Sequence, residues 1–243
     1  NNYPILKTLW HFGYSVICVS RNINGYCHKI ADHSILLDYS NTSNLIEVMQ
    51  KYRTKIVIPG CDDLAYLTAS SLGVISNVER FDSVRNGLTL HHKNRLRKLL
   101  TSLGFKQPKF DELTNQKRRP AHNLKFPVLT KPIDLASGRG VIKVTDPKNL
   151  AEAASMTLQL TKRKQILVEE YIEGNLHSCL IVVKSKKIVF SFFADEYIDE
   201  ANFTVIGAHT SISLSYKQKT AMLSNLDMVI HQLNLNDGIL HTQ

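Results

Sequence analysis

A lysine and a glycine-containing loop stand close together near the middle of the sequence. Lys131 follows the apolar run 126–130, which is typical of a β-strand, and Ser137, Gly138, Arg139 and Gly140 come a few residues later. Glycines let backbone N–H groups approach an anion, while lysine and arginine supply positive charge. The arrangement therefore suits a polyphosphate. It is not a P-loop, because the GxxxxGK[ST] spacing is absent, and taken alone the loop is better explained as a hairpin turn.

Two further segments carry charge in a suggestive order. Lys93 opens a basic amphipathic helix before the lysine strand, and Val168-Glu169-Glu170-Tyr171-Ile172-Glu173-Gly174 follows it. Each has a simpler reading, since Lys93 stands among other cations as a solvated lysine would, and paired glutamates are common at an exposed strand end.

The order Lys93, Lys131, glycine loop and Glu169-Glu170-Tyr171-Ile172 resembles the ATP-grasp superfamily, which includes biotin carboxylase and the carbamoyl phosphate synthetase large subunit. The resemblance covers essentially the whole sequence. It is strongest to carbamoyl-phosphate-synthetase-like proteins that share a Gly-x-Leu-His-Ser segment, here residues 174–178. It implies an ATP-dependent, ADP-forming ligase that joins a small-molecule carboxylate to an amine through an acyl phosphate, using ATP and Mg²⁺, for which Mn²⁺ could substitute.

The resemblance also implies roles for individual residues. Lys93 and Lys131 would hold the α and β phosphates, and Arg139 would follow the γ-phosphate, which makes Lys131 and Arg139 the expected catalytic residues. The loop Ser137, Gly138, Arg139 and Gly140 would close over the β and γ phosphates.

The adenine ring would lie at a hinge formed by Glu169, Glu170, Tyr171 and Ile172. In this reading, Glu169 accepts a hydrogen bond from the adenine amino group, and the backbone at Tyr171 and Ile172 contacts the ring edge.

The later part of the sequence departs from the family pattern at the ribose. Leu176 stands where many members carry an acidic residue, so either His177 substitutes or the ribose is held differently. His209 lies in a Gly-x-His-Thr segment that resembles one near the nucleotide of carbamoyl phosphate synthetase. Gln243 matches the first metal-binding side chain, and an amide oxygen is an acceptable ligand for Mg²⁺.

Two other functions stay open. A non-catalytic ATP- or ADP-binding module of the same fold is the main alternative, favoured by Leu176. Nucleic-acid binding is a weaker one, suggested only by the net charge of +9, because the basic residues are dispersed apart from Lys117-Arg118-Arg119.

The first ninety residues alternate predicted helices and strands, which indicates a mainly parallel sheet covered on both faces. Helices are predicted at 3–10, 44–52 and 62–72, and strands at 16–19, 34–38 and 55–59. Asp62 and Asp63 follow the last strand and are read as helix caps rather than substrate contacts.

The remaining residues form two further groups of predicted elements. The first group comprises helices at 93–100 and 147–160 and strands at 126–130, 140–144 and 165–171. The second group comprises strands at 177–183, 188–194, 209–215 and 239–243 and a helix at 218–233.

The fold class is therefore α/β, with a Rossmann-like pre-ATP-grasp domain at 1–90, a linker helix and lid subdomain at 91–173, and an incomplete antiparallel-sheet subdomain at 174–243. The first strand of a doubly wound domain is missing and the last strand stops at the final residue, so the sequence looks shortened at both ends.

Composition agrees with a cytoplasmic enzyme. With 43% hydrophobic residues, the 243-residue chain can bury a sizeable core, and no apolar run approaches the roughly 20 residues of a membrane helix. The four cysteines lack CxxC spacing, so reduced thiols and no zinc site are expected. A homodimer is compatible with the resemblance, because family members are often dimers.

Overall fold

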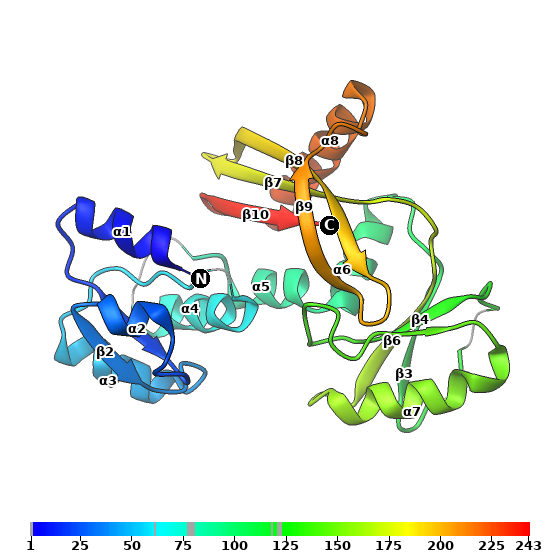
Figure 1. The fold of residues 1–243 in the computed structure, drawn as a ribbon, viewed down its shortest axis with the longest axis horizontal. Coiled ribbons are helices and arrows are strands. Elements are labelled where there is room, and N and C mark those ends of the chain that lie inside the picture. Colours follow the sequence, from blue (N-terminus) through cyan, green and yellow to red (C-terminus); the bar gives the residue numbers. More distant parts are fainter. Residues whose placement is uncertain (1, 61, 77–80, 118, 121–122) are drawn as a thin grey trace. The chain divides into compact units, whose positions relative to one another are not determined.

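The computed structural model describes residues 2–60, 62–76, 81–117, 119–120 and 123–243, which divide into two compact units. Unit 1 spans Asn1–Gly87 and unit 2 spans Leu88–Gln243. Arg118 of the basic run at 117–119 and one of the four cysteines, Cys61, lie outside the described residues. Figure 1 shows the element order by colour along the chain.

Unit 1 is built of helices around a short parallel sheet. Its elements are α1 (Tyr3–His11), β1 (Ile17–Ser20), α2 (Tyr26–Ile30), β2 (His33–Leu36), α3 (Thr42–Lys51) and α4 (Asp63–Ser76), and α5 (Val84–His91) leads into unit 2. Strands β1 and β2 pair in parallel. Asp62 caps α4, since its Oδ1 accepts from the Ala65 N–H at 2.8 Å.

The strand predicted at 55–59 is wrong, because these described residues form no strand. Ile56 and Ile58 are each 46% exposed. A run of β-branched residues becomes a strand only where another strand pairs with it, and no strand of the described chain pairs with this one.

Unit 2 contains two antiparallel sheets. The β4 sheet has the order β3-β6-β4-β5, formed by β3 (Phe110–Thr114), β4 (Val128–Pro132), β5 (Ile142–Val144) and β6 (Gln165–Glu170). The β7 sheet has the order β10-β7-β8-β9, formed by β7 (Leu176–Lys184), β8 (Lys187–Asp199), β9 (Thr204–Thr210) and β10 (Gly238–Thr242). The helices are α6 (Lys93–Ser102), a short 3₁₀ turn at Pro147–Asn149, α7 (Leu150–Leu160) and α8 (Tyr216–Leu233). The mixed α/β class with antiparallel sheets is thereby confirmed.

The strand predicted at 209–215 is displaced, since β9 ends at Thr210. The N–H groups of Ile212 and Ser213 are instead bonded to the Asp195 carboxylate, each at 3.2 Å. Ser215 then begins α8 with a capping box that involves Gln218. Local side-chain acceptors thus take the donors that a longer strand would have used.

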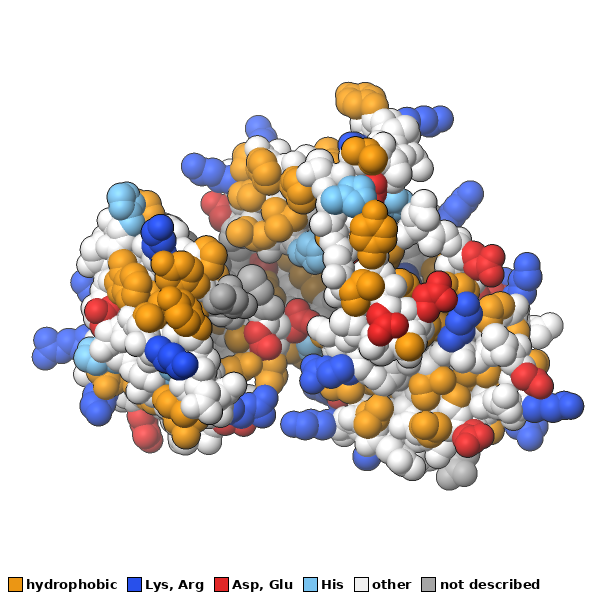
Figure 2. Space-filling view, viewed as in Figure 1, with side chains coloured by type: hydrophobic (Ala, Val, Ile, Leu, Met, Phe, Trp, Pro, Cys, Tyr) orange, Lys and Arg blue, Asp and Glu red, His pale blue; other side chains and the backbone are white. Residues whose placement is uncertain are grey.

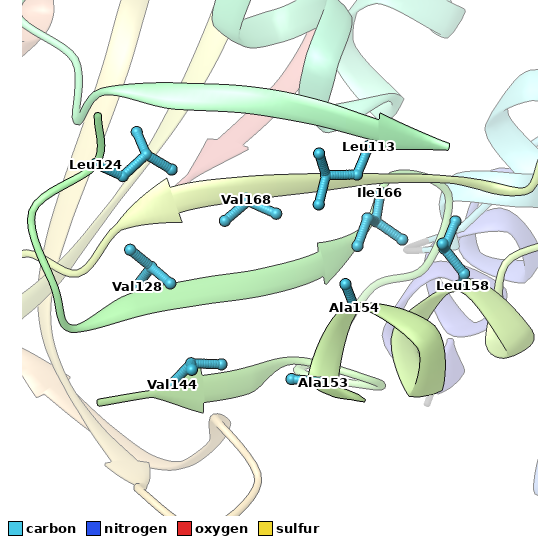
Figure 3. Close-up of a cluster of buried hydrophobic side chains, with 9 residues drawn as sticks. All are labelled: Leu113, Leu124, Val128, Val144, Ala153, Ala154, Leu158, Ile166 and Val168. Atoms are coloured by element: carbon cyan, nitrogen blue, oxygen red, sulfur yellow. The ribbon is translucent and has the colours of Figure 1, made fainter. Parts of the chain in front are cut away.

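The β4 sheet has one apolar face and a second face, here called the polar face, that carries charged groups beside the buried Leu129 and Leu167. Figure 3 shows the apolar face, where Val128, Ile166 and Val168 belong to one buried cluster with Ala154 and Leu158 of α7. Since burying one such aliphatic side chain contributes about 1.5–3 kcal/mol, this cluster is the main source of stability for the sheet. Residues at alternate positions in β4 and β6 must point to the opposite face, which is where the charged groups described next are found.

Candidate functional site

Lys131 and Glu169 meet on the polar face of the β4 sheet. Lys131 lies on β4 and Glu169 on the neighbouring β6, two positions apart in the pairing register. The lysine Nζ is 2.5 Å from the Glu169 Oε1. The glutamate side chain is 4% exposed, so the ion pair is largely withdrawn from solvent.

Arg97 of α6 binds the other oxygen of the same carboxylate. Its Nε donates to the Glu169 Oε2 at 2.8 Å, and its Nη1 donates to the Gln107 Oε1 at 2.7 Å. Burial alone raises the pKa of Glu169, but the charges and hydrogen bonds of Lys131 and Arg97 outweigh it, so the pKa lies below its usual value. Breaking such a buried pair by removing one partner typically costs about 3–5 kcal/mol.

Lys93 lies at the start of α6 beside the end of β4. Its Nζ donates to the carbonyl of Leu135, and its backbone N–H donates to the carbonyl of Ile133 at 3.2 Å. The structure therefore brings Lys93 next to the segment that follows Lys131.

The glycine loop that follows has a backbone only some residues can adopt. Ser137, Gly138 and Gly140 have φ values of 57°, 70° and 74°. A Cβ on Gly138 would lie 2.4 Å from the Asn202 carbonyl oxygen and 2.6 Å from that of Phe203. The loop thus touches the backbone of the turn between β8 and β9, which links the two sheets of unit 2.

Arg139 is exposed and bonds within its own loop. Its Nε donates to the Ala136 carbonyl at 3.3 Å. The expected contact of Arg139 with a γ-phosphate stays a prediction.

The predicted hinge, residues 169–172, begins in the last two residues of β6 and continues beyond the end of the strand at Glu170. The Tyr171 N–H donates to the Pro127 carbonyl at 2.9 Å, and Lys143 Nζ lies 3.8 Å from the centre of the Tyr171 ring. The Glu170 carboxylate accepts from the Lys125 N–H at 2.8 Å. Because the Tyr171 N–H is already bonded, the hinge hypothesis must rely on the Tyr171 carbonyl and on Ile172, whose side chain is 67% exposed.

The two histidines and the glutamine predicted for the site lie on opposite faces of the β7 sheet. His177, Asp195 and His209 pair across β7, β8 and β9, so they share one face. That face also carries Cys179, which packs in the cluster beneath α8. Gln243 instead reaches Glu196, which comes from the other face.

His177 has a structural partner. Its Nδ1 lies 2.8 Å from the Asp195 Oδ1. Hydrogen bonds, foremost one from Ser211, lower the pKa of Asp195 well below its usual range despite the opposing effect of desolvation. His209 bonds to the Thr210 carbonyl and to the Tyr197 hydroxyl, at 2.8 and 3.0 Å. These contacts of His177 and His209 do not involve Lys131.

Gln243 and Glu196 offer the oxygen ligands that Mg²⁺ prefers. The Gln243 Nε2 donates to the Glu196 Oε2 at 2.6 Å, and the His241 Nε2 lies 3.9 Å from the Glu196 Oε1. Within the described part of the chain, no group of three or more His, Cys, Asp or Glu side chains is placed to hold a metal. Gln243 and Glu196 could therefore supply only part of the coordination sphere of Mg²⁺.

Charge and hydropathy add two observations. Figure 2 shows Lys and Arg side chains scattered over the visible face instead of gathered in one patch. Of the helices in the described chain, none combines the length and apolar character that crossing a membrane requires.

Comparison with known proteins identifies the family. Residues 124–243 match the ATP-grasp domain family. A curated relative, the formate-dependent phosphoribosylglycinamide formyltransferase of Prochlorococcus marinus (strain NATL1A), is 27% identical over 181 residues, which are 71% of this chain and 45% of the relative. The chain thus spans about half the length of the curated relatives it matches.

Solved structures agree in fold. The L-amino acid ligase of Bacillus licheniformis superposes with a TM-score of 0.80 at 16% identity, over 98% of this chain and 59% of that one. The biotin carboxylase domain of Hydrogenobacter thermophilus 2-oxoglutarate carboxylase, solved with MgADP, ADP and bicarbonate, gives 0.81 at 16% identity, over 98% and 57%. Residues 124–243 therefore belong to the ATP-grasp domain family, and the solved structures agree with that family in fold.

Proposed function

We propose that this chain is part of an ATP-dependent ligase that joins a carboxylate to an amine through an acyl phosphate. The observation that carries the proposal is the meeting of Lys131, Glu169 and Arg97 on the polar face of the β4 sheet, directly before the glycine loop. Mg-ATP would bind in unit 2 between the β4 and β7 sheets, with Lys131 and Lys93 at the phosphates and residues 169–172 at the adenine.

The chemistry follows from the groups available. A carboxylate oxygen of the substrate attacks the γ-phosphorus, the bond to the ADP oxygen breaks, and an acyl phosphate forms. The amine nitrogen then attacks the acyl carbon, phosphate leaves, and the amine proton passes to solvent. Magnesium would neutralise phosphate charge, with Gln243 and Glu196 as its ligands from this chain. Lys131, Arg139 and the backbone N–H groups of the loop would orient the phosphates and stabilise their developing charge.

The names of similar proteins support the carboxylate half of this reaction. One neighbour in fold is called an L-amino acid ligase, and one relative in sequence is called formate-dependent, and both names refer to a carboxylate-bearing compound. We propose small-molecule carboxylates and amines as substrates, Mg²⁺ or Mn²⁺ as the metal, a homodimer as the assembly and the cytoplasm as the location. The division at 1–90, 91–173 and 174–243 is likewise our proposal for the functional domains.

Nucleotide binding is the first test. Thermal unfolding of the full-length natural protein would be followed with and without Mg-ADP, for the wild type, Lys131→Ala and Lys148→Ala. Nucleotide at about 100-fold over its Kd should stabilise a binding protein by roughly 2.7 kcal/mol. We expect this shift in the wild type and in Lys148→Ala, whose lysine is exposed on the turn before α7, but not in Lys131→Ala. An absent shift in the wild type would contradict the proposal.

Catalysis is tested by phosphate release from ATP with a panel of carboxylates and amines. Arg139→Ala should lower kcat while leaving the affinity for Mg-ADP nearly unchanged. The alternative, a non-catalytic ATP- or ADP-binding module, is favoured by Leu176 at the position of the ribose-binding acid. Binding of Mg-ADP without phosphate release from any substrate pair would favour that alternative.

A further inference from the structure

Glu169 is held by two cations, of which one has a second proposed task. Lys131 contacts Oε1 and is proposed to bind the nucleotide phosphates, whereas Arg97 contacts Oε2. An incoming polyphosphate competes with Glu169 for the Lys131 ammonium group. The Glu169 side chain is only 4% exposed. If its ion pair with Lys131 weakened, its buried negative charge would be less well compensated.

We propose that Arg97 is a positioning residue that keeps Glu169 paired and ionised while Lys131 turns to the phosphates. This inference rests on the proposed nucleotide function of the same site. It adds a residue from α6 whose partner on β6 lies 72 positions away along the sequence.

The geometry makes the Arg97 contact independent of Lys131. Arg97 comes from a different element, uses the other carboxylate oxygen, and is braced by Gln107 at 2.7 Å. Its planar guanidinium presents several N–H donors, so it holds the Glu169 and Gln107 oxygens at the same time. The Arg97 side chain is 26% exposed, which leaves it less solvated than a free surface arginine.

The other charged groups near Glu169 do not replace Arg97. Glu112 of β3 lies on the same face of the β4 sheet and is itself negative. It is compensated by Lys98, Asn94 and Gln165. Lys93 of α6 donates its Nζ to the Leu135 carbonyl. Glu170 points to the opposite face and accepts from the Lys125 backbone.

The consequence is a change in proton uptake. Without Arg97, nucleotide binding would leave Glu169 short of a cation, and the pKa of Glu169 would rise in the complex above its value in the free protein. A group whose pKa rises on binding takes up a proton, so binding becomes tighter as the pH falls, by up to about tenfold per pH unit. In the wild type, Arg97 prevents this uptake.

The experiment is calorimetric titration of the full-length natural protein with Mg-ADP in two buffers of different ionisation enthalpy, repeated at several pH values. Compared with the wild type, Arg97→Met should bind at least about tenfold more weakly at pH 8, a difference of about 1.4 kcal/mol, and should take up additional protons on binding at the lower pH values of the series. The control Lys98→Met removes the neighbouring cation of α6, which pairs with Glu112, and should match the wild type.

The double variant Arg97→Met with Glu169→Gln separates charge from structure. It has no carboxylate to protonate, so the additional proton should disappear. If Arg97→Met does not unfold cooperatively, Arg97→Gln, which keeps a polar stem without the charge, is judged by the same criteria. The inference would be overturned if folded Arg97→Met or Arg97→Gln bound Mg-ADP with the same affinity as the wild type and took up the same number of protons on binding. Absence of Mg-ADP binding by the wild type would instead overturn the proposed function.

Discussion

Replacing Gly138 by alanine tests the contact between the glycine loop and the turn after β8. The added Cβ would lie 2.4 Å from the Asn202 carbonyl oxygen and 2.6 Å from that of Phe203. Both obstacles are backbone atoms, so relief requires a shift of the loop or the turn. We expect the clash to cost about 1–3 kcal/mol, as for other overpacked sites.

Gly104 provides a matched control. Its φ of +78° is close to the +70° of Gly138, but a Cβ there would meet nothing within 4 Å. A left-handed alanine costs about 1–2 kcal/mol, offset by about 0.4–1 kcal/mol because the unfolded chain loses freedom. This backbone cost applies to both variants, so the difference between them isolates the clash.

The assay is urea denaturation followed in parallel by far-UV circular dichroism and tryptophan fluorescence. Trp10, the single tryptophan of the sequence, belongs to unit 1, so its fluorescence serves as an internal reference. We expect Gly138→Ala to lower the free energy of unfolding seen by circular dichroism more than Gly104→Ala does, by about 1–3 kcal/mol. Equal losses in the two variants would refute the contact.

Two further predictions concern buried polar groups of unit 2. The Thr130 and Thr157 hydroxyls are 2.7 Å apart. Thr130→Val should lower the free energy of unfolding by about 1–3 kcal/mol, because it leaves the Thr157 hydroxyl without this partner. In urea denaturation, the double variant Thr130→Val with Thr157→Val should lose less stability than the sum of the losses of the two single variants. Burial, together with Arg163, His91 and Arg95, lowers the pKa of His92 to about 4. His92 of the unfolded chain binds a proton near pH 6.5, whereas His92 of the folded chain stays neutral at that pH. The contribution of His92 to the free energy of unfolding is therefore fully present above pH 6.5, and about 2 kcal/mol of it should be lost between pH 7 and pH 4. His92→Asn should remove this loss in denaturation series at each pH, and an unchanged pH dependence would show that another group is responsible.

Much of the ATP-grasp architecture could be predicted from the sequence because its signals are local. The apolar run before Lys131 and the apolar run 166–168 predict β4 and β6, and both strands are found. The helix predicted at 218–233 is found as α8, Tyr216–Leu233. The resemblance to the ATP-grasp superfamily, which rests on the order of such segments, is confirmed.

What the sequence could not supply depends on long-range pairing. Strand β3 was not predicted, because its charged residues Asp111 and Glu112 obscure the apolar pattern, and it forms by pairing with β6. Arg97 was missed as a site residue, although it lies four positions after Lys93 on the same helical face. A spacing of four residues indicates that two side chains share one face of a helix, but it does not predict which carboxylate will contact that face.

The roles of His177, His209 and Gln243 in nucleotide and metal binding stay predictions, because local pattern does not decide which face of the β7 sheet each residue occupies. His177, His209 and Gln243 were placed in one site by resemblance, yet strand pairing puts the histidines on one face and the glutamine contact on the other. Which face a residue occupies depends on register, and register is set by the whole sheet.

The two-sided character of β6 has a consequence for how this chain can vary. Ile166 and Val168 face the apolar cluster under α7, while Leu167 and Glu169 face α6. A mutational scan of β6 should therefore show a preference for apolar side chains at residues 166–168, on both faces, and for a carboxylate at Glu169. Removing one residue from the middle of β6 would exchange the two faces and carry a carboxylate into the apolar cluster. We expect length differences among natural homologues to fall in the loops on either side of β6, and the strand itself to keep its length while its individual residues diverge.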